Sequence, residues 1–283
     1  MFGVNRQVYY RKIKRKTHKQ HIAQEVVSMV NDIRKIMPRI GTRKLYFLLF
    51  DKLELKKIGR DKFFDILRAN HLLIQPKRSY HLTTNSHHRF RKHQNWVLDL
   101  KINRPEQVWV SDITYIGKRD APCYLSLVTD AYSKKIMGYY VADNLNTKSS
   151  LFALKMALKQ RKNKKQTLIH HSDRGLQYCA EEYQKVLCKN KVKCSMTQNS
   201  DPYENVVAER INGILKQEFM IDKYNQKKQI MQKVVKEAID IYNQFRPHYS
   251  NYMLTPNQMH NQNSIQMRTY RTKNSSKPEL ATV

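Results

Sequence analysis

Acidic side chains are scarce in this sequence. Its 283 residues include 23 Asp and Glu against 53 Lys and Arg, which gives a net charge of +30. Such an excess makes a compact chain repel itself, and a bound polyanion relieves the repulsion. Nucleic acid is the natural candidate, because each phosphate that a Lys or Arg contacts releases counterions. The charge balance therefore predicts a nucleic-acid-binding protein.

Cysteines and long apolar runs are also few. The four cysteines form no CxxC pair and no disulfide-scaffold spacing, so we expect small buried side chains in a reducing cytosol. No cysteine precedes Cys123, which excludes a zinc finger built on His18 and His21. No apolar run approaches the length of a bilayer span, and the first residues lack the apolar core of a signal peptide. The sequence predicts a cytoplasmic, nucleoid-associated protein with no membrane partner.

The positive charge is densest in the first third of the chain. Residues 1–101 have a net charge of +17, and residues 102–283 have +13. A basic run, RKIKRKTHK, occupies residues 11–19. We expect it to contact DNA phosphates, with a solvated tail as the alternative. Residues 1–21 are therefore interpreted as a basic N-terminal arm.

Residues 22–74 show helical spacing of apolar positions. A first stripe runs from Ile22 to Met37 and is closed by Pro38, a second helix follows Thr42 as its predicted N-cap, and a third follows Gly59. Three short helices with basic residues between them favour a helix-turn-helix DNA-binding region. Periodicity alone leaves a plain helical bundle as the alternative.

The period of the pattern changes after a basic linker over residues 75–102. Three runs with alternating or continuous apolar residues predict an antiparallel meander: 107–116, 124–130 and 135–141. Strands and helices then alternate, with helices near 151–158, 180–189, 204–220 and 227–244 and strands at 167–171 and 193–196. This order predicts an α/β fold with a mixed sheet flanked by helices, over residues 103–260. A polar tail is expected at 261–283.

Three acidic residues stand out as candidate metal ligands. Asp112 interrupts the apolar run VWVSDITYI, where a carboxylate is costly unless it is paired, protonated or bound to metal. Asp173 follows a predicted strand end, where ligands collect in α/β sheets. Each acid has an alternative interpretation: Asp112 as a turn-like breaker, Asp173 as a loop Asx residue and Glu209 as a surface helix charge. Taken singly, the alternative is favoured for Glu209 and is about equal to the metal-ligand interpretation for Asp173. Together, in so basic a chain, they are interpreted as catalytic ligands of Mg²⁺ or Mn²⁺.

The helix that carries Glu209 has two distinct faces. At 100° per residue, four polar residues share one face: Asn205, Glu209, Asn212 and Lys216. Four apolar residues fall opposite: Val207, Ile211, Ile214 and Leu215. We expect the apolar face to pack on the sheet and the polar face to look outward into a cleft.

These stretches resemble one family. The words WVSDITYI, TDAYSKKIMGYYV, IHHSDRGLQY and NVVAERINGILKQE, and IYNQFRPHYSNYMLTP further on, are similar to those of DDE transposases with a retroviral-integrase-like catalytic core. The resemblance is to the insertion-sequence group whose transposase is encoded in two overlapping frames. The 35 residues between Asp173 and Glu209, and Lys216 seven past the glutamate, match that group. Lys134 departs from its usual Arg and Glu204 from its usual Asp, which puts fine positioning in question.

The resemblance implies a ribonuclease-H-like fold with a five-stranded mixed sheet, in agreement with the elements predicted above. It implies that Asp112, Asp173 and Glu209 hold two divalent ions, Mg²⁺ or Mn²⁺. The implied reaction is cleavage at insertion-sequence ends and transfer of the 3′-hydroxyl to a new phosphodiester. Implied partners are double-stranded DNA, further copies of this chain on that DNA, and a DNA-binding protein from an upstream frame. The opening GVNRQVYYRK resembles the tail of a further helix-turn-helix, so Met1 need not begin the complete active protein.

Several other residues are predicted to support the site. The expected DNA contacts are Lys216, Asn205, Asn212, Arg174, Arg43, Lys44, Arg60 and Lys62. Lys216 has a solvated helix lysine as its alternative, and Gln177 is expected to orient substrate. His170 and His171 either assist the site or satisfy hydrogen bonds at a strand end. A nucleophile role for Ser111, Ser172 or Tyr178 is disfavoured, because the sequence shows no partnered base.

Two rival functions remain at this level. One is a nuclease of the same fold that cuts DNA without rejoining it. The other is a non-catalytic DNA-binding regulator of transposition, which the three intact acids argue against.

Overall fold

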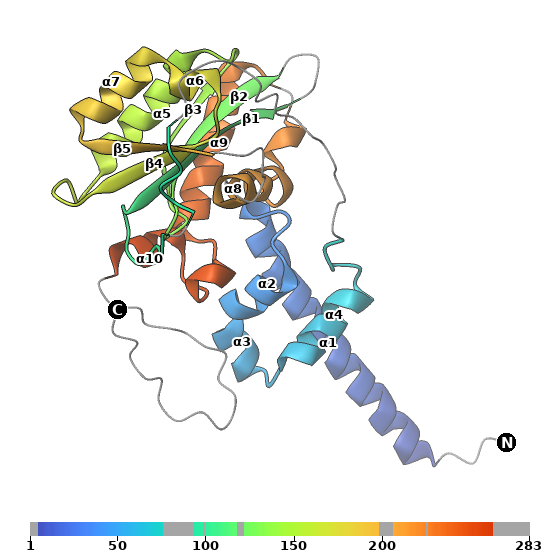
Figure 1. Ribbon diagram of the computed structural model, residues 1–283. Coiled ribbons are helices and arrows are strands. Elements are labelled where there is room, and N and C mark those ends of the chain that lie inside the picture. Colours follow the sequence, from blue (N-terminus) through green and yellow to red (C-terminus); the bar gives the residue numbers. More distant parts are fainter. Residues whose placement is uncertain are drawn as a thin grey trace. The chain divides into compact units, whose positions relative to one another are not determined.

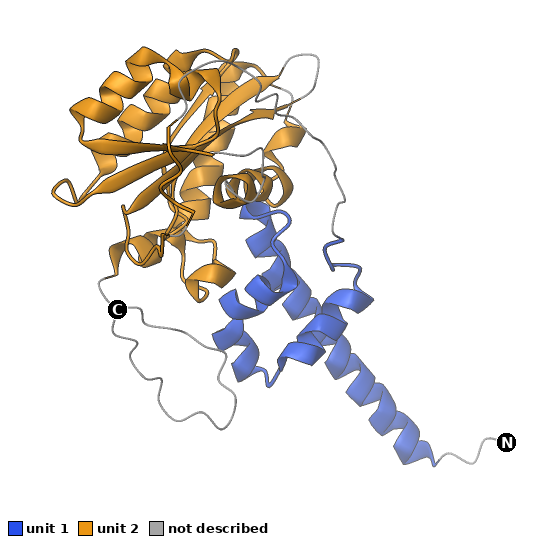
Figure 2. Ribbon diagram, viewed as in Figure 1, with its two compact units in different colours: residues 1–79 blue, residues 80–283 orange. Residues whose placement is uncertain are grey.

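The chain forms two compact units, which are coloured separately in Figure 2. The computed structural model describes residues 5–75, 93–98, 100–117, 122–197, 206–224 and 226–262. Unit 1 comprises Met1–Ser79 and unit 2 comprises Tyr80–Val283. Among the described residues, no helix is both long and apolar enough to cross a membrane.

Unit 1 is all-helical in its described part, as expected. Its helices are α1 (Arg6–Ile36), α2 (Thr42–Leu48), α3 (Phe50–Leu55) and α4 (Arg60–Ala69). A small core holds them together through fully buried side chains: Val26, Val30, Leu45, Leu53, Phe63 and Leu67. Arg34 of α1 also donates a hydrogen bond to the carbonyl of Leu72 at 2.7 Å, which ties the segment after α4 to α1.

Helix α1 begins much earlier than the apolar stripe predicts. It starts at Arg6, where the Asn5 side chain accepts a hydrogen bond from Gln7 N, rather than at Ile22. The predicted arm over residues 5–21 is thus helical in its described part. The segment contains no Gly or Pro between Arg6 and Ile36 and is rich in Lys, Arg and Gln, which favour helix. Because its first turns are exposed on every side, they carry no apolar stripe.

The second predicted helix is two helices. α2 and α3 meet at Leu49, which caps the first and precedes the second with φ −98° and ψ 5°. Thr42 is not the N-cap: Gly41 has that position, and Thr42 is the first, buried residue of α2. The third helix follows Gly59, as predicted.

Unit 2 is built on a five-stranded mixed sheet. Its strands are β1 (Val108–Ile116), β2 (Cys123–Asp130), β3 (Ile136–Ala142), β4 (Leu168–Ser172) and β5 (Val192–Met196). They lie in the order β3-β2-β1-β4-β5 (Figure 1), with β1 antiparallel to β2, β2 antiparallel to β3, and β4 parallel to both β1 and β5. This confirms the ribonuclease-H-like mixed sheet.

Helices cover both faces of this sheet. α5 (Thr147–Gln160), α6 (Leu176–Cys179) and α7 (Glu181–Lys189) lie on one face, while α8 (Val206–Gln217) and α9 (Lys228–Gln244) lie on the other (Figure 1). Alternate residues of β1 serve the two layers: Trp109 packs with α5 and α7, while Val108 and Val110 pack with Ala208 of α8. Both faces of β1 are therefore buried at its start, which gives a continuous apolar run there.

Gly138 allows α5 to approach β3 closely. A Cβ at this position would collide with the carbonyl oxygen of Ala153 and would lie 2.8 Å from the amide nitrogen of Ala157. Both atoms are backbone atoms of α5 and cannot turn away. A residue without a side chain is therefore required here.

The end of α9 and the segment after it are bonded to the start of β3 and to the turn between β2 and β3. The Asn243 side chain exchanges two 3.0 Å hydrogen bonds with the backbone of Ile136, and Asn251 donates to the carbonyl of Ser133 at 2.6 Å. A short helix, α10 (Pro256–Asn261), follows the 3₁₀ turn Tyr249–Asn251. His260 is buried there, 3.0 Å from Ser133 Oγ. The core therefore ends in packed structure, and the predicted tail lies outside the described residues from 263 on.

The last part of the predicted linker also belongs to the core. Trp96 N donates to Ser195 Oγ at 2.9 Å, and Lys193 Nζ lies 3.1 Å from the centre of the Trp96 ring. Val97, Leu100 and Ile102 pack against the α8 side of the sheet. Most of the linker before them, from residue 76 to 92, lies outside the described residues.

Candidate active site

Asp112 and Asp173 lie next to each other because of strand register. Ser111 of β1 and Ser172 of β4 are the last parallel partners of these two strands. Asp112 and Asp173 each follow directly after one of them, so the two acids lie side by side. Neighbouring strands are about 4.8 Å apart, and both positions fall on the face that packs against α8. Two carboxyl groups separated by 60 residues in sequence are thus brought to one edge of the sheet.

Asp112 is a partly buried carboxyl group with a raised pKa. Its Oδ1 accepts a hydrogen bond from Ile113 N at 2.9 Å, and its Oδ2 accepts one from Asn212 Nδ2 at 2.7 Å. Burial, followed by the charge of Asp173 and a smaller effect of Glu209, raises the pKa of Asp112 to about 7, although the two hydrogen bonds lower it. A neighbouring cation would remove the repulsion that resists ionisation.

Asp173 is held by the turn that follows β4. Gly175 N donates to Asp173 Oδ1 at 3.0 Å, which closes a tight turn before α6. A Cβ on Gly175 would lie only 3.0 Å from that same carboxylate oxygen. The turn therefore fixes the carboxylate close to the backbone at the strand end.

Glu209 comes from α8 and does not complete a preformed ligand cluster. It is exposed, partial desolvation raises its pKa, and its charge acts on Asp112. Within the part of the chain that the structure describes, no three His, Cys, Asp or Glu side chains are grouped closely enough to hold a metal ion. The structure thus brings Asp112 and Asp173 together and places Glu209 within electrostatic reach. Like-charge repulsion among three carboxylates opposes a closer approach without a cation.

The donor set suits a hard divalent cation. Carboxylate oxygens at 2.0–2.6 Å are the usual ligands of Mg²⁺ and Ca²⁺. Asp112 and Asp173 offer such oxygens from two adjacent strand ends, and Asn212 Oδ1 is a buried oxygen with no partner among the described residues. The residues present therefore fit a divalent metal, and Glu209 is a further acid whose charge acts on Asp112.

Asn212, on the predicted polar face of α8, meets Asp112 instead of facing away from the sheet. Asn212 is 6% exposed and binds Asp112, so it positions a site carboxylate in addition to, or in place of, the DNA contact that we predicted. Lys216 Nζ lies 4.7 Å from the centre of the Tyr115 ring. Burial lowers the pKa of Lys216 below its usual value, and the charges of Asp222 and Asp112 offset this lowering only in part. The prediction that this face of α8 looks outward into a cleft is therefore wrong for Asn212, because its side chain packs against β1 and bonds to Asp112.

The two histidines of β4 belong to the interior. His170 Nε2 lies 2.7 Å from Ser111 Oγ and 2.9 Å from Tyr183 OH, and burial lowers the pKa of His170 to about 3. A ring with so low a pKa is a poor proton acceptor at neutral pH, so this buried pair gives Ser111 no activated hydroxyl. His171 Nδ1 lies 2.9 Å from Ser195 Oγ. Both histidines satisfy hydrogen bonds at a strand end, the second of the two alternatives.

Tyr178 is a site neighbour whose importance sequence reasoning missed. It is 2% exposed, and its hydroxyl is buried with no hydrogen-bond partner among the described residues. Burial and then the charges of Asp173, Tyr183 and Asp112 raise its pKa well above the usual value. The only available signal was its place five residues after Asp173, which does not show burial. Tyr178 stays protonated and offers a donor beside the acids.

The predicted DNA contacts are distributed over both units. In unit 2, Arg174 Nε donates to the carbonyl of Thr197 at 2.6 Å, Gln177 Nε2 donates to that of Leu145 at 3.0 Å, and Asn205 lies outside the described residues. In unit 1, Arg43, Arg60 and Lys62 are exposed and Lys44 is half-buried. Arg60 lies 3.0 Å from the carboxylate of Asp61. These positions remain predictions for DNA contact.

Comparison with known proteins gives consistent matches. Two models described as "Integrase core domain" match residues 102–202 and 190–256. The insertion element IS600 uncharacterized 31 kDa protein of Shigella sonnei is 30% identical over 253 residues, covering 88% of this chain and 92% of that protein. Transposase InsF for insertion sequence IS3A of Escherichia coli strain K12 is 31% identical over 166 residues, which cover 58% of this chain and 57% of InsF.

Solved structures are similar at lower identity. The HTLV-2 integrase catalytic core domain, in a structure described as a complex with magnesium, is 19% identical. The match covers 56% of this chain and 97% of that domain, with a TM-score of 0.44.

Proposed function

This chain belongs to the integrase-core DDE transposases of bacterial insertion sequences, and from that premise we propose that it cleaves DNA at element ends and transfers the resulting 3′-hydroxyl to a new phosphodiester. The observation that carries the proposal is the pair Asp112 and Asp173 at the adjacent ends of β1 and β4. Two neighbouring carboxylates at one edge of the sheet repel each other, and a cation that binds both of them and a DNA phosphate removes this repulsion.

In the proposed site, Asp112, Asp173 and Glu209 are the metal ligands. Two Mg²⁺ or Mn²⁺ ions, when bound, would supply Lewis-acid stabilisation of the attacking and leaving oxygens. Asp112 must give up its proton to serve as a ligand, and its pKa near 7 lets it do so at neutral pH once a cation is near. Glu209, on the exposed surface of α8, is the proposed third ligand, and its charge already acts on Asp112.

The neighbouring residues orient these ligands and the substrate. Asn212 donates to Asp112 Oδ2 and Ile113 N donates to Oδ1, so the two hydrogen bonds together fix the carboxylate plane. Lys216, one turn further along α8, supplies a cation that a DNA phosphate can contact. His170 remains neutral inside the sheet and takes no proton from substrate.

The partners follow from the same proposal. The substrates are double-stranded DNA of the element ends and of the target, and copies of this chain assemble on that DNA. The helices α2 to α4 act as a helix-turn-helix region that contacts DNA through Arg43, Lys44, Arg60 and Lys62. A DNA-binding protein from an upstream frame is a further proposed partner.

The test uses labelled element-end DNA, taken from the flanks of the gene, with a target duplex and Mg²⁺. Both an intact end and a precleaved end are supplied. Wild type should nick the first and join the second to the target. Asp112→Asn, Asp173→Asn and Glu209→Gln should each lose both products by at least 100-fold while still binding DNA.

Exposed Asp240→Asn is the matched control and should keep both activities. Release of nicked DNA without any joined product from the precleaved end would show a nuclease. Unchanged products in Asp173→Asn would sink the proposed site.

A further inference from the structure

Among the described residues, no neighbour buries the first half of α1. Every residue from Arg6 to His21 is exposed, and the first fully buried side chain of α1 is Val26. At 1.5 Å per residue, this exposed stretch of 16 residues is about 24 Å long. Packing therefore does not explain why this part of the helix is kept.

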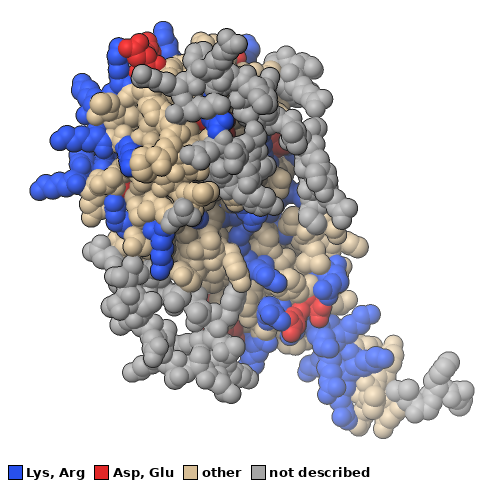
Figure 3. All heavy atoms as spheres, in the orientation of Figure 1, with Lys and Arg blue, Asp and Glu red and all other residues tan. Residues whose placement is uncertain are grey.

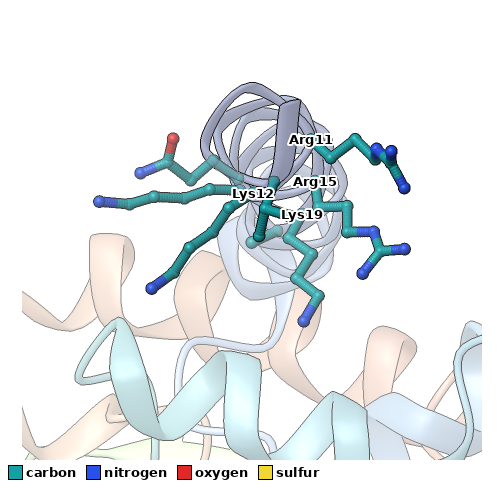
Figure 4. Close-up of a pocket in the computed structure, with 8 residues that line it drawn as sticks. Arg11, Lys12, Arg15 and Lys19 are labelled. Atoms are coloured by element: carbon teal, nitrogen blue, oxygen red, sulfur yellow. The ribbon is translucent and has the colours of Figure 1, made fainter. Parts of the chain in front are cut away.

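One face of this stretch is strongly basic. Arg11, Lys12, Arg15, Lys16 and Lys19 line a shallow surface pocket along the helix, and they fall within an arc of about 140° at 100° per residue. In Figure 4, which looks nearly along the helix, Arg11, Arg15 and Lys19 extend outward and do not point toward one another. Figure 3 shows Lys and Arg gathered densely over the same part of unit 1. These five residues are called the basic face of α1 from here on.

The basic face has no internal counter-charge. In the described part of the chain, none of its five cations forms an ion pair with a carboxylate, and Arg11 donates only to the neutral Gln7 side chain at 3.2 Å. The first acid of α1 is Glu25, which is paired with Lys56. The cations of the basic face are therefore free to meet an external anion.

The arrangement also costs the helix stability. Positions 11 and 15, 12 and 16, and 15 and 19 are like-charge pairs at i,i+4, each destabilising by about 0.2–0.5 kcal/mol. An extended polyanion bound along the face would attract all of these cations and so offset the repulsion within the three pairs. The spacing of the cations over about 12 Å of helix fits a run of several phosphates at about 3.4 Å of axis per phosphate of one strand.

We propose that the basic face of α1 binds the phosphate backbone of double-stranded DNA without reading its sequence. This inference rests on the proposed function, and it adds a contact surface that is separate from the helices α2 to α4 and from the acidic site. Flexible Lys and Arg side chains on an exposed helix supply charge, whereas base reading requires fixed bidentate contacts within a groove. The face therefore adds affinity and salt dependence but no specificity.

The test measures binding of the full chain to a 40-base-pair duplex of random sequence as a function of salt. In one variant, Arg11, Lys12, Arg15, Lys16 and Lys19 are all replaced by Gln, which retains helix propensity. In a matched variant, five exposed lysines of unit 2 are replaced by Gln: Lys155, Lys159, Lys164, Lys165 and Lys189. The two variants lose the same formal charge, and circular dichroism checks that each keeps its helix.

If all five cations contact phosphates, the slope of log K against log salt falls by about 4.5 in the basic-face variant. Between 50 and 200 mM salt, wild type would then lose about 500-fold more affinity than this variant does. The matched variant should change the slope by less than about 1. The ratio of affinities for element-end and random DNA should stay the same in both.

Equal slopes in the two variants would overturn the proposal, because net charge alone would then explain binding. A changed affinity ratio would overturn the claim that the face is blind to sequence. A loss of self-association in sedimentation velocity without DNA, with the slope intact, would assign the face to a second copy instead. Joining of a precleaved end by wild type is measured in parallel, so failure here and failure of the proposed function are distinguishable.

Discussion

Replacing Asp112 by Asn tests the physical basis of the candidate site. Burial and the charge of Asp173 raise the pKa of Asp112 from 3.8 to about 7, so the folded protein holds this proton more tightly than the unfolded chain does. The free energy of unfolding must then fall as pH rises from about 4 to 7, and it is level on either side. At 1.36 kcal/mol per pKa unit, the whole effect is at most about 4 kcal/mol.

The Asn side chain has nearly the shape of the protonated acid and no titration. Without divalent metal, Asp112→Asn should therefore be more stable than wild type at pH 8 by roughly 2–4 kcal/mol, and this advantage should shrink by about 2 kcal/mol at pH 5. Urea unfolding in EDTA, followed by tryptophan fluorescence, measures the difference. Both tryptophans, Trp96 and Trp109, belong to unit 2, so the signal reports the unit that contains the site.

Asp240→Asn, at an exposed position of α9, is the control and should follow wild type at both pH values. Adding Mg²⁺ at pH 8 should stabilise wild type more than Asp112→Asn, because only the wild type keeps the carboxylate pair. If the stability difference between wild type and Asp112→Asn is the same at pH 5 and pH 8, the argument from buried like charges is refuted. Equal stabilisation by Mg²⁺ would refute the metal assignment separately.

Three further outcomes follow from individual contacts. Asn212→Ala should raise the pKa of Asp112 further, because the hydrogen bond from Asn212 lowers that pKa in the wild type. ¹³C NMR of the Asp112 carboxyl group without metal measures the titration midpoint, and an unchanged midpoint would contradict this role of the bond. His260→Gln should destabilise the protein by about 1 kcal/mol more at pH 6 than at pH 9. Burial lowers the pKa of His260, but two buried carboxylates, Glu106 at 3.6 Å and Asp130 at 3.8 Å, outweigh it and raise that pKa. The stabilisation is therefore present below pH 6.5 and is lost as pH rises, and equal urea midpoint shifts at the two pH values would contradict this. Gly138→Ala should lower the free energy of unfolding by about 2–4 kcal/mol, because its Cβ would collide with the backbone of α5. Gly213→Ala, with open space around it, should be neutral or stabilising. Urea unfolding measures both, and similar values for the two variants would show that α5 moves aside.

The strands and the candidate acids could be predicted from local sequence. The apolar run in VWVSDITYI marks β1 because apolar side chains cover both faces of the strand, and Asp112 stands out because it breaks that run. The position of Asp173 at a strand end follows from the turn residues after β4. The family resemblance gave the sheet type and suggested which acids belong together.

Other features depended on contacts that no local pattern records. The first half of α1 shows no apolar stripe, and none of the described residues packs on it, so the pattern could not mark its start. In sequence, His260 is the last residue before the predicted polar tail, and Trp96 falls in the predicted linker. They are ordered by partners far along the chain, Ser133 for His260 and Ser195 for Trp96.

The sequence by itself determined the sheet, the excess of positive charge and the three acids, because periodicity, composition and spacing are properties of the chain. Only the tertiary structure decided what each polar face meets. The helical wheel of α8 shows that Asn212 and Lys216 lie together, but strand register and packing decide that Asn212 reaches Asp112 at 2.7 Å. The same packing raises the pKa of Asp112, since burial and a neighbouring charge arise only when β1, β4 and α8 come together.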